Sequence, residues 1–195
     1  MKFTLMPIAM ILCIMSATQV LAVFEKNPPV LKKIISEEVS QFYVTDYVPY
    51  VKVELNSAQD KLQYIKQPEQ TVIMYVCSQA QGNVDWFLTT LSRDYSASFL
   101  ANMADQGKTK DMVSKEMKTS FADVDVWLQS IIAYGDYNII HYVKKKVTDG
   151  SVVGIGDVAV RFQVDMGGGW KVENISDDVV FKNWNFVGDS MVITK

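Results

Sequence analysis

Hydrophobic and polar positions change their spacing once along this chain. Between residues 67 and 120 apolar residues recur at intervals of three and four, which predicts amphipathic helices. From Ala122 onward they alternate with polar residues, which predicts β-strands. Helices followed by antiparallel strands indicate the α+β class.

The first helix is predicted to begin at Gln67-Pro68-Glu69, because proline fits the first helical turn and an acidic side chain complements the helix dipole. Gly82-Asn83 is expected to end it and to start a second helix. The apolar face of that second helix is Val84, Phe87, Leu88 and Leu91. A third, more polar helix is predicted around Lys108 to Ser120.

Extended segments and turns alternate after residue 121. The predicted strands are the segment with Val124, Val126 and Leu128, then Tyr137 to Val147, Val158 to Val164 and Trp170 to Ile175. The predicted turns are Tyr134–Tyr137, Thr148–Ser151 and Gly167–Gly169. We therefore expect an antiparallel meander.

Two segments precede the helices. Apolar residues at helical spacing predict a surface helix over Val30 to Phe42, and Tyr43 to Leu55 is expected to be extended. The expected organisation is a signal peptide at 1–22, this helix and extended segment at 23–66, and an α+β domain with a C-terminal tail at 67–195.

The N-terminus has the features of a secretory signal peptide. Lys2 is followed by an apolar core and by the modest residues Val20-Leu21-Ala22. We expect cleavage after Ala22 and a periplasmic or secreted protein. The alternative is an uncleaved anchor, which would be the membrane contact of the protein. Pro7 and the polar residues in the second half of the segment weigh against a spanning helix.

Composition narrows the partners and cofactors. Cleavage would remove Lys2, one of 19 basic side chains, so the formal net charge would go from −3 to −4. A mildly acidic chain is not expected to bind nucleic acid. Cys77 would be the sole cysteine of the mature chain and His141 is the sole histidine, so we expect no internal disulfide, no multi-imidazole metal site and no cofactor.

The order of these features resembles a known superfamily. A helix opened by Pro-Glu, a Gly-Asn break, a short helix with Trp86-Phe87 and long hairpins ending in Gly-Gly-Trp-Lys-Val are similar to the nuclear transport factor 2-like, or cystatin-like cone, superfamily. The resemblance covers about Gln67 to Ile175. It implies a curved sheet wrapped around helices with a cavity, and it implies this fold more firmly than an activity.

The resemblance also implies where chemistry would lie, since enzymes of this superfamily place an aspartate, or a histidine with an aspartate, inside the cone beside a tyrosine. The candidates here are His141, Asp125, Tyr137, Tyr142 and Asp157. His141 shares a strand face with Tyr137, Ile139 and Val143, which fits a residue facing a cavity. A single strand histidine with a structural role explains the same pattern, and no catalytic role is assigned.

Three further features are open to both structural and functional interpretations. Cys77 is expected to be buried and inert on its helix. Lys144-Lys145-Lys146 is either a docking patch for acidic lipid or protein, or a solvated hairpin tip. Gly154-Ile155-Gly156 is interpreted as a bulge or bend in a strand.

These observations favour an exported, non-catalytic binding domain. Its partner would be a small apolar ligand in a cone pocket or a protein on the sheet face, with homodimerisation through exposed aromatic residues such as Trp127 as one form. One alternative is a cofactor-independent isomerase or dehydratase acting on a small carbonyl compound. Another is a component of an envelope complex.

Overall fold

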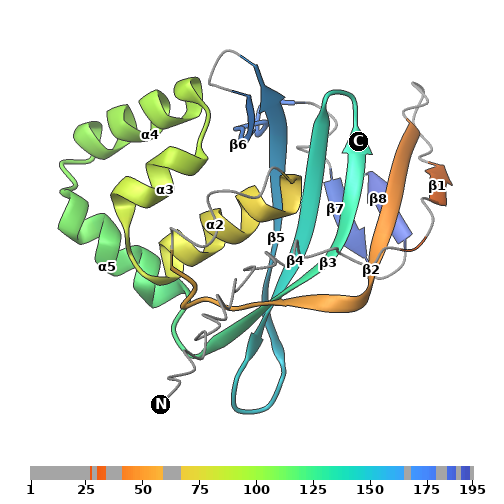
Figure 1. Ribbon diagram of the computed structural model, residues 1–195. Helices are drawn as coiled ribbons and strands as arrows, with labels where there is room; N and C mark the ends of the chain where they lie inside the picture. Colours follow the sequence, from red (N-terminus) through yellow and green to blue (C-terminus); the bar gives the residue numbers. More distant parts are fainter. Residues whose placement is uncertain are drawn as a thin grey trace, which may run out of the picture.

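The computed structural model describes residues 27, 30–33, 41–58, 67–164, 168–178, 184–187 and 190–193. These residues form an α+β structure with helices on one side of an antiparallel sheet (Figure 1). The helices are α2 (Pro68–Ala80), α3 (Val84–Thr90), α4 (Arg93–Asp105) and α5 (Lys110–Ser120). The sheet contains β1 (Val30–Lys33), β2 (Gln41–Val53), β3 (Val124–Tyr134), β4 (Tyr137–Lys146), β5 (Val152–Gln163) and β6 (Gly169–Val172).

The six strands lie in the sheet in chain order, and each pairs antiparallel with its sequence neighbour. The predicted meander is therefore confirmed. β7 (Trp184–Val187) and β8 (Ser190–Ile193) pair with each other in a separate two-stranded sheet. The expected signal peptide lies outside the described residues.

Polar side chains fix the starts of three helices. Asn83, Ser92 and Thr109 are the N-caps of α3, α4 and α5, and each side chain accepts a hydrogen bond from the amide three residues further on. Pro68 occupies the first turn of α2, as predicted. α4 is an addition to the predicted elements.

The predicted helix over Val30 to Phe42 is wrong at both ends. Val30–Lys33 is β1, and it pairs with the start of β2, which includes Phe42. Main-chain pairing thus overrides the helical spacing of the apolar residues; residues 34–40 lie outside the described part. The extended segment predicted from Tyr43 is confirmed as β2. This strand changes register against β3 between Asp46 and Val51, and it bends there (Figure 1).

The core lies between the helices and one face of the sheet. On β4, Ile140 and Tyr142 belong to the same buried cluster as residues of α2, α3 and α5. Ile139 and Val143 are equally buried but lie outside that cluster, because neighbouring strand residues point to opposite faces. Both faces of the sheet are therefore covered at the centre of β4. The main members of the helix-side cluster are Tyr47, Val72, Val76, Trp86, Phe87, Leu91, Val126, Leu128, Ile140, Tyr142, Val158 and Val160.

Candidate functional site

The structure brings together two of the candidate residues, His141 and Asp157. They stand opposite each other on β4 and β5, and His141 Nδ1 lies 2.8 Å from Asp157 Oδ1. The His141 side chain is 7% exposed and that of Asp157 19% exposed. Ser130 of β3, also buried, is the cross-strand neighbour of His141 on its other side. A hydroxyl, an imidazole and a carboxylate thus share one row across three strands.

The pair does not face the helices. His141 lies between Ile140 and Tyr142, which point into the helix-side core, so its side chain points to the opposite face with Ile139 and Val143. The sequence placed His141 on the same face as Ile139 and Val143, as the structure does. The face they share is directed away from the space between helices and sheet, so it does not line a cavity there.

Tyr142 lies on the helix face and reaches across β5 at a glycine. A Cβ added to Gly156 would lie 2.3 Å from the ring carbon Cζ of Tyr142. Burial raises the pKa of Tyr142 to about 12, and the negative charge of Asp157 adds to the shift. The phenol is therefore a neutral hydrogen-bonding group at ordinary pH.

A small pocket of about 120 Å³ lies between Asp157–Ala159 of β5 and residues 172–176. Its lining includes Tyr75 from α2, Tyr95 from α4, Asp157 and Glu173. Burial raises the pKa of both Tyr75 and Tyr95. Phenol and carboxylate groups near a histidine can donate and accept protons. Tyr75 and Tyr95 were not among the candidates, because their helical positions gave no sign that they would meet β5.

Asp125 and Tyr137 lie away from this pair. The carboxylate of Asp125 lies 2.9 Å from the ammonium of Lys52 in a half-exposed ion pair. The ring of Tyr137 lies 5.6 Å from the guanidinium of Arg161. These contacts give both residues a structural role.

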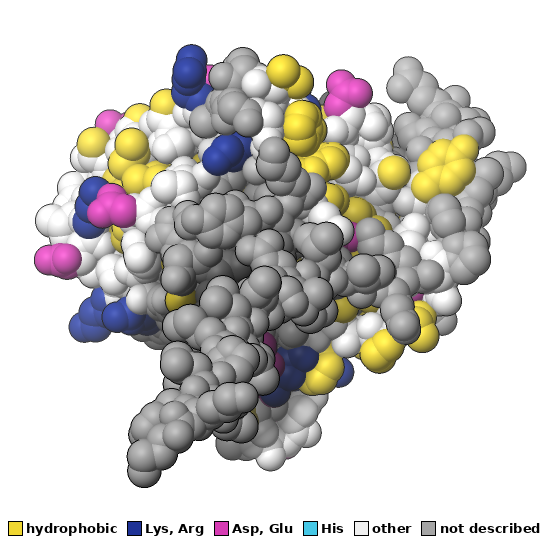
Figure 2. Space-filling view, viewed as in Figure 1, with side chains coloured by type: hydrophobic (Ala, Val, Ile, Leu, Met, Phe, Trp, Pro, Cys, Tyr) yellow, Lys and Arg dark blue, Asp and Glu magenta, His cyan; other side chains and the backbone are white. Residues whose placement is uncertain are grey.

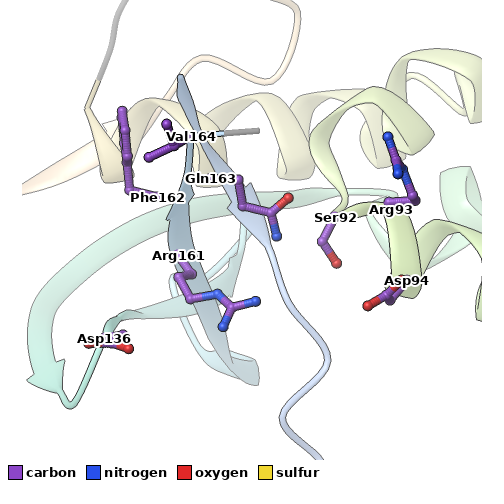
Figure 3. A pocket seen from close by; sticks show the side chains of 8 residues that line it. All are labelled: Ser92, Arg93, Asp94, Asp136, Arg161, Phe162, Gln163 and Val164. Carbon is purple, nitrogen blue, oxygen red and sulfur yellow. The ribbon is translucent and has the colours of Figure 1, made fainter. Parts of the chain in front are cut away.

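A larger, polar cleft of about 680 Å³ lies at the other end of β5 (Figure 3). Arg161 and Gln163 extend from one face of the strand toward Ser92 and Asp94 at the start of α4. Glu173 lies beside the cleft and accepts hydrogen bonds from Ser92, Arg161 and Gln163, so these cleft side chains already hold one another in place.

The third feature of β5 is its open edge. β6 pairs with Val160 to Gln163, and one more hydrogen bond joins the amide of Glu173 to the carbonyl of Ala159. In the described part of the chain no strand pairs with Val152–Val158 on the side away from β4. The hairpin of β4 and β5 projects beyond the body of the molecule (Figure 1).

Apolar side chains are exposed along this hairpin. Val147, Val152, Val153 and Ile155 are between 47% and 62% exposed. Figure 2 shows hydrophobic and lysine side chains next to each other at the lower end of the molecule, over the hairpin. From the sequence, only the lysines here were expected to form either a docking patch or a solvated hairpin tip. Gly154-Ile155-Gly156 was expected to be a bulge or bend, and the register against β4 does shift beside it, where Val153 is an extra residue.

Cys77 is fully buried, as predicted, and its thiol donates a hydrogen bond to the carbonyl of Glu54 at 3.4 Å. Burial raises its pKa to about 12. The described residues bring together no group of three or more His, Cys, Asp or Glu side chains that would hold a metal ion.

Comparison of the chain with protein-family models, with curated proteins and with solved structures finds no match. Within the described parts of the chain, no helix combines the length and the apolar character needed to span a bilayer.

Proposed function

We propose that this chain is an exported, non-catalytic binding domain of the cone-like type, and that its partner is a protein segment that pairs with the open edge of β5. The observation that carries the proposal is the unequal length of β5 and β6. β5 has twelve residues, and β6 has four. An unpaired stretch of strand presents main-chain donors and acceptors that another extended chain can use.

The direction of the main-chain groups supports this interaction. The carbonyl of Ala159 points toward β6, since it accepts the amide of Glu173. In an antiparallel ladder every second residue directs its N–H and C=O to the same side. Ile155 therefore directs its groups to the open edge, because β5 keeps one register against β4 between Gly154 and Arg161. Asp157 directs its groups to the same side, where Asn174, Ile175 and Ser176 line the small pocket with it.

The side chains of the edge are also suited to pairing. Natural sheet edges are commonly protected by proline, lysine or inward-pointing charges. The sequence Val152-Val153-Gly154-Ile155-Gly156 contains none of these, although a bulge is another common protection and Val153 forms one. Exposed β-branched residues on such an edge stabilise an added strand through cross-strand contacts.

A protein partner is favoured over a small apolar ligand. The space between the helices and the sheet is filled by the core cluster. The pocket beside Tyr75 and the cleft beside Arg161 have more polar than apolar lining. A third hollow of about 490 Å³, lined mainly by apolar side chains such as Leu88, Leu91 and Leu100, is a groove of α3 and α4 that is open to solvent. A carrier of an apolar molecule needs a largely apolar cavity that encloses most of the ligand.

Site-specific photo-cross-linking in the exporting cell tests the proposal. A benzophenone amino acid replaces Val153 at the edge, and in a matched control it replaces the exposed Thr119 of α5. We expect a discrete adduct from position 153 only, lost when Ile155→Pro is added, with the cross-linked peptide identified by mass spectrometry. Absence of an adduct from position 153, or equal adducts from both positions, would contradict the proposal.

The second candidate function is proton-transfer catalysis on a small carbonyl compound. The 2.8 Å contact between His141 and Asp157 favours it, because a base oriented by a carboxylate is the arrangement that such chemistry uses. Since the chain has one histidine, its imidazole signals in an NMR spectrum belong to His141. Saturable shifts of these signals on adding small cyclic ketones would support the candidate, and unchanged signals would contradict it.

A further inference from the structure

We propose that the partner at the β5 edge is a second copy of this chain, paired antiparallel about a two-fold axis at Ile155. The inference rests on the proposed function and names the partner. It starts from the open edge of β5, where Ile155 directs its main-chain groups outward and has a side chain that is 58% exposed. A strand that pairs antiparallel with its own copy forms an isologous interface, in which both copies use the same residues.

An apolar row makes Ile155 the centre of this pairing. Trp127 stands opposite Val143, and Val143 stands opposite Ile155, so the three residues form one row across β3, β4 and β5. The row ends at the open edge with the exposed Ile155. Two-fold pairing at this residue places Ile155 against Ile155 and joins the two rows into one apolar stripe across both sheets.

On the other face of the sheet, the glycines beside Ile155 allow a second strand to approach β5 closely. Gly154 and Gly156 flank Ile155, and pairing about Ile155 places Gly154 of one copy opposite Gly156 of the other. Neither glycine adds a side chain between the strands. The ring of Tyr142 already covers Gly156 on that face.

Sedimentation equilibrium of the full chain, purified after export, tests this pairing. We expect a reversible dimer, with twice the mass of the monomer. Ile155→Pro removes one outward N–H from each copy, and the loss of two main-chain hydrogen bonds should weaken the dimer about a hundredfold. The substitution leaves the bonds between β4 and β5 in place, because they do not use this N–H.

Ile155→Lys is the second variant, since it changes no main-chain group and places like charges opposite each other at the axis. The matched control is Val147→Lys at the hairpin turn, 62% exposed before substitution, which should leave the dimer intact. A monomeric wild-type chain, or a dimer that neither Ile155 variant weakens, would overturn the inference.

The photo-cross-linking experiment separates this inference from the proposed function. An adduct between two copies of the chain through position 153 supports both. An adduct with a different protein overturns self-pairing and leaves the proposed function standing. Absence of any adduct, together with a monomeric chain, overturns both.

Discussion

The ring of Tyr142 occupies the space that a side chain at Gly156 would need. A Cβ at this position would lie 2.3 Å from Cζ and 2.5 Å from the hydroxyl oxygen of the ring. Tyr142 is buried in the helix-side core, so the ring has little room to move. We expect Gly156→Ala to lower the free energy of unfolding by about 1–3 kcal/mol, as overpacking does elsewhere. Chemical denaturation measures this change.

Gly154→Ala is the matched control for that substitution. Its Cβ would meet the side chain of Lys144 at 3.6 Å, which is an ordinary contact. The alanine restricts the unfolded chain, so we expect an unchanged stability or a gain of up to about 1 kcal/mol. Equal losses for both glycines would show that the ring is not the cause.

The contact between His141 and Asp157 is expected to contribute measurable coupling energy. A double-mutant cycle with His141→Ala and Asp157→Ala should give about 1.5 kcal/mol, because both side chains are largely removed from water. The half-exposed pair of Lys52 and Asp125 provides the comparison, and its cycle should give less than about 1 kcal/mol. A coupling of zero for the histidine pair would contradict this account.

Glu173 is expected to be the most important carboxylate of the polar cleft. It is 11% exposed and accepts hydrogen bonds from three side chains, including Ser92, which also caps α4. Glu173→Gln keeps the shape but turns an acceptor into a donor, so we expect a loss of about 2 kcal/mol in unfolding free energy. Glu116→Gln, in the exposed pair with Lys108, should change stability by less than about 0.5 kcal/mol.

Cys77 is expected to make stability fall in alkali. Its pKa is about 12 in the folded protein and near its ordinary value of 9.0 when unfolded. The contribution is complete below pH 9.0 and is lost as the pH rises toward 12, because only the unfolded thiol ionises there. Cys77→Ala should reduce the slope of unfolding free energy against pH in this interval by up to about 1.4 kcal/mol per pH unit. An unchanged slope would contradict the predicted ionisation.

The same thiol should be protected from alkylation. In the native protein it is fully buried, so iodoacetamide should modify it only as fast as the surrounding structure opens. Denatured protein should react at the rate of a free cysteine. Rapid modification of the native protein would show that the thiol is accessible.

Much of the fold was predictable because local signals and tertiary packing agree. The α+β class, the start of α2 at Pro68 and the strand order after α5 follow from periodicity and turn residues. α4 was not predictable from its apolar pattern, because only Met103 is buried among its thirteen residues. The segment from Val30 shows the opposite case, since pairing with β2 decides its conformation despite its helical spacing.

The site was predictable only as a set of separate residues. Near the hairpin turn Lys145 pairs with Val152, and continuing that register would place His141 opposite Gly156. Val153 is an extra residue, so His141 pairs with Asp157 instead. A shift of one residue moves a side chain to the other face of a sheet. The sequence does not indicate such an insertion. The open edge depends on the length of β6, which the sequence does not indicate either.

The placement of β2 has a consequence for how the chain reaches its native state. β3 and β4 are joined by a turn of two residues, Gly135 and Asp136, so their pairing closes a very short loop. α2 to α5 separate β2 from β3 in the sequence, so the pairing of these two strands closes a much longer loop. The entropy lost on closing a loop rises with its length, and distant contacts form slowly for this reason. We therefore expect the hairpins of β3, β4 and β5 to form first and β2 to join the sheet last.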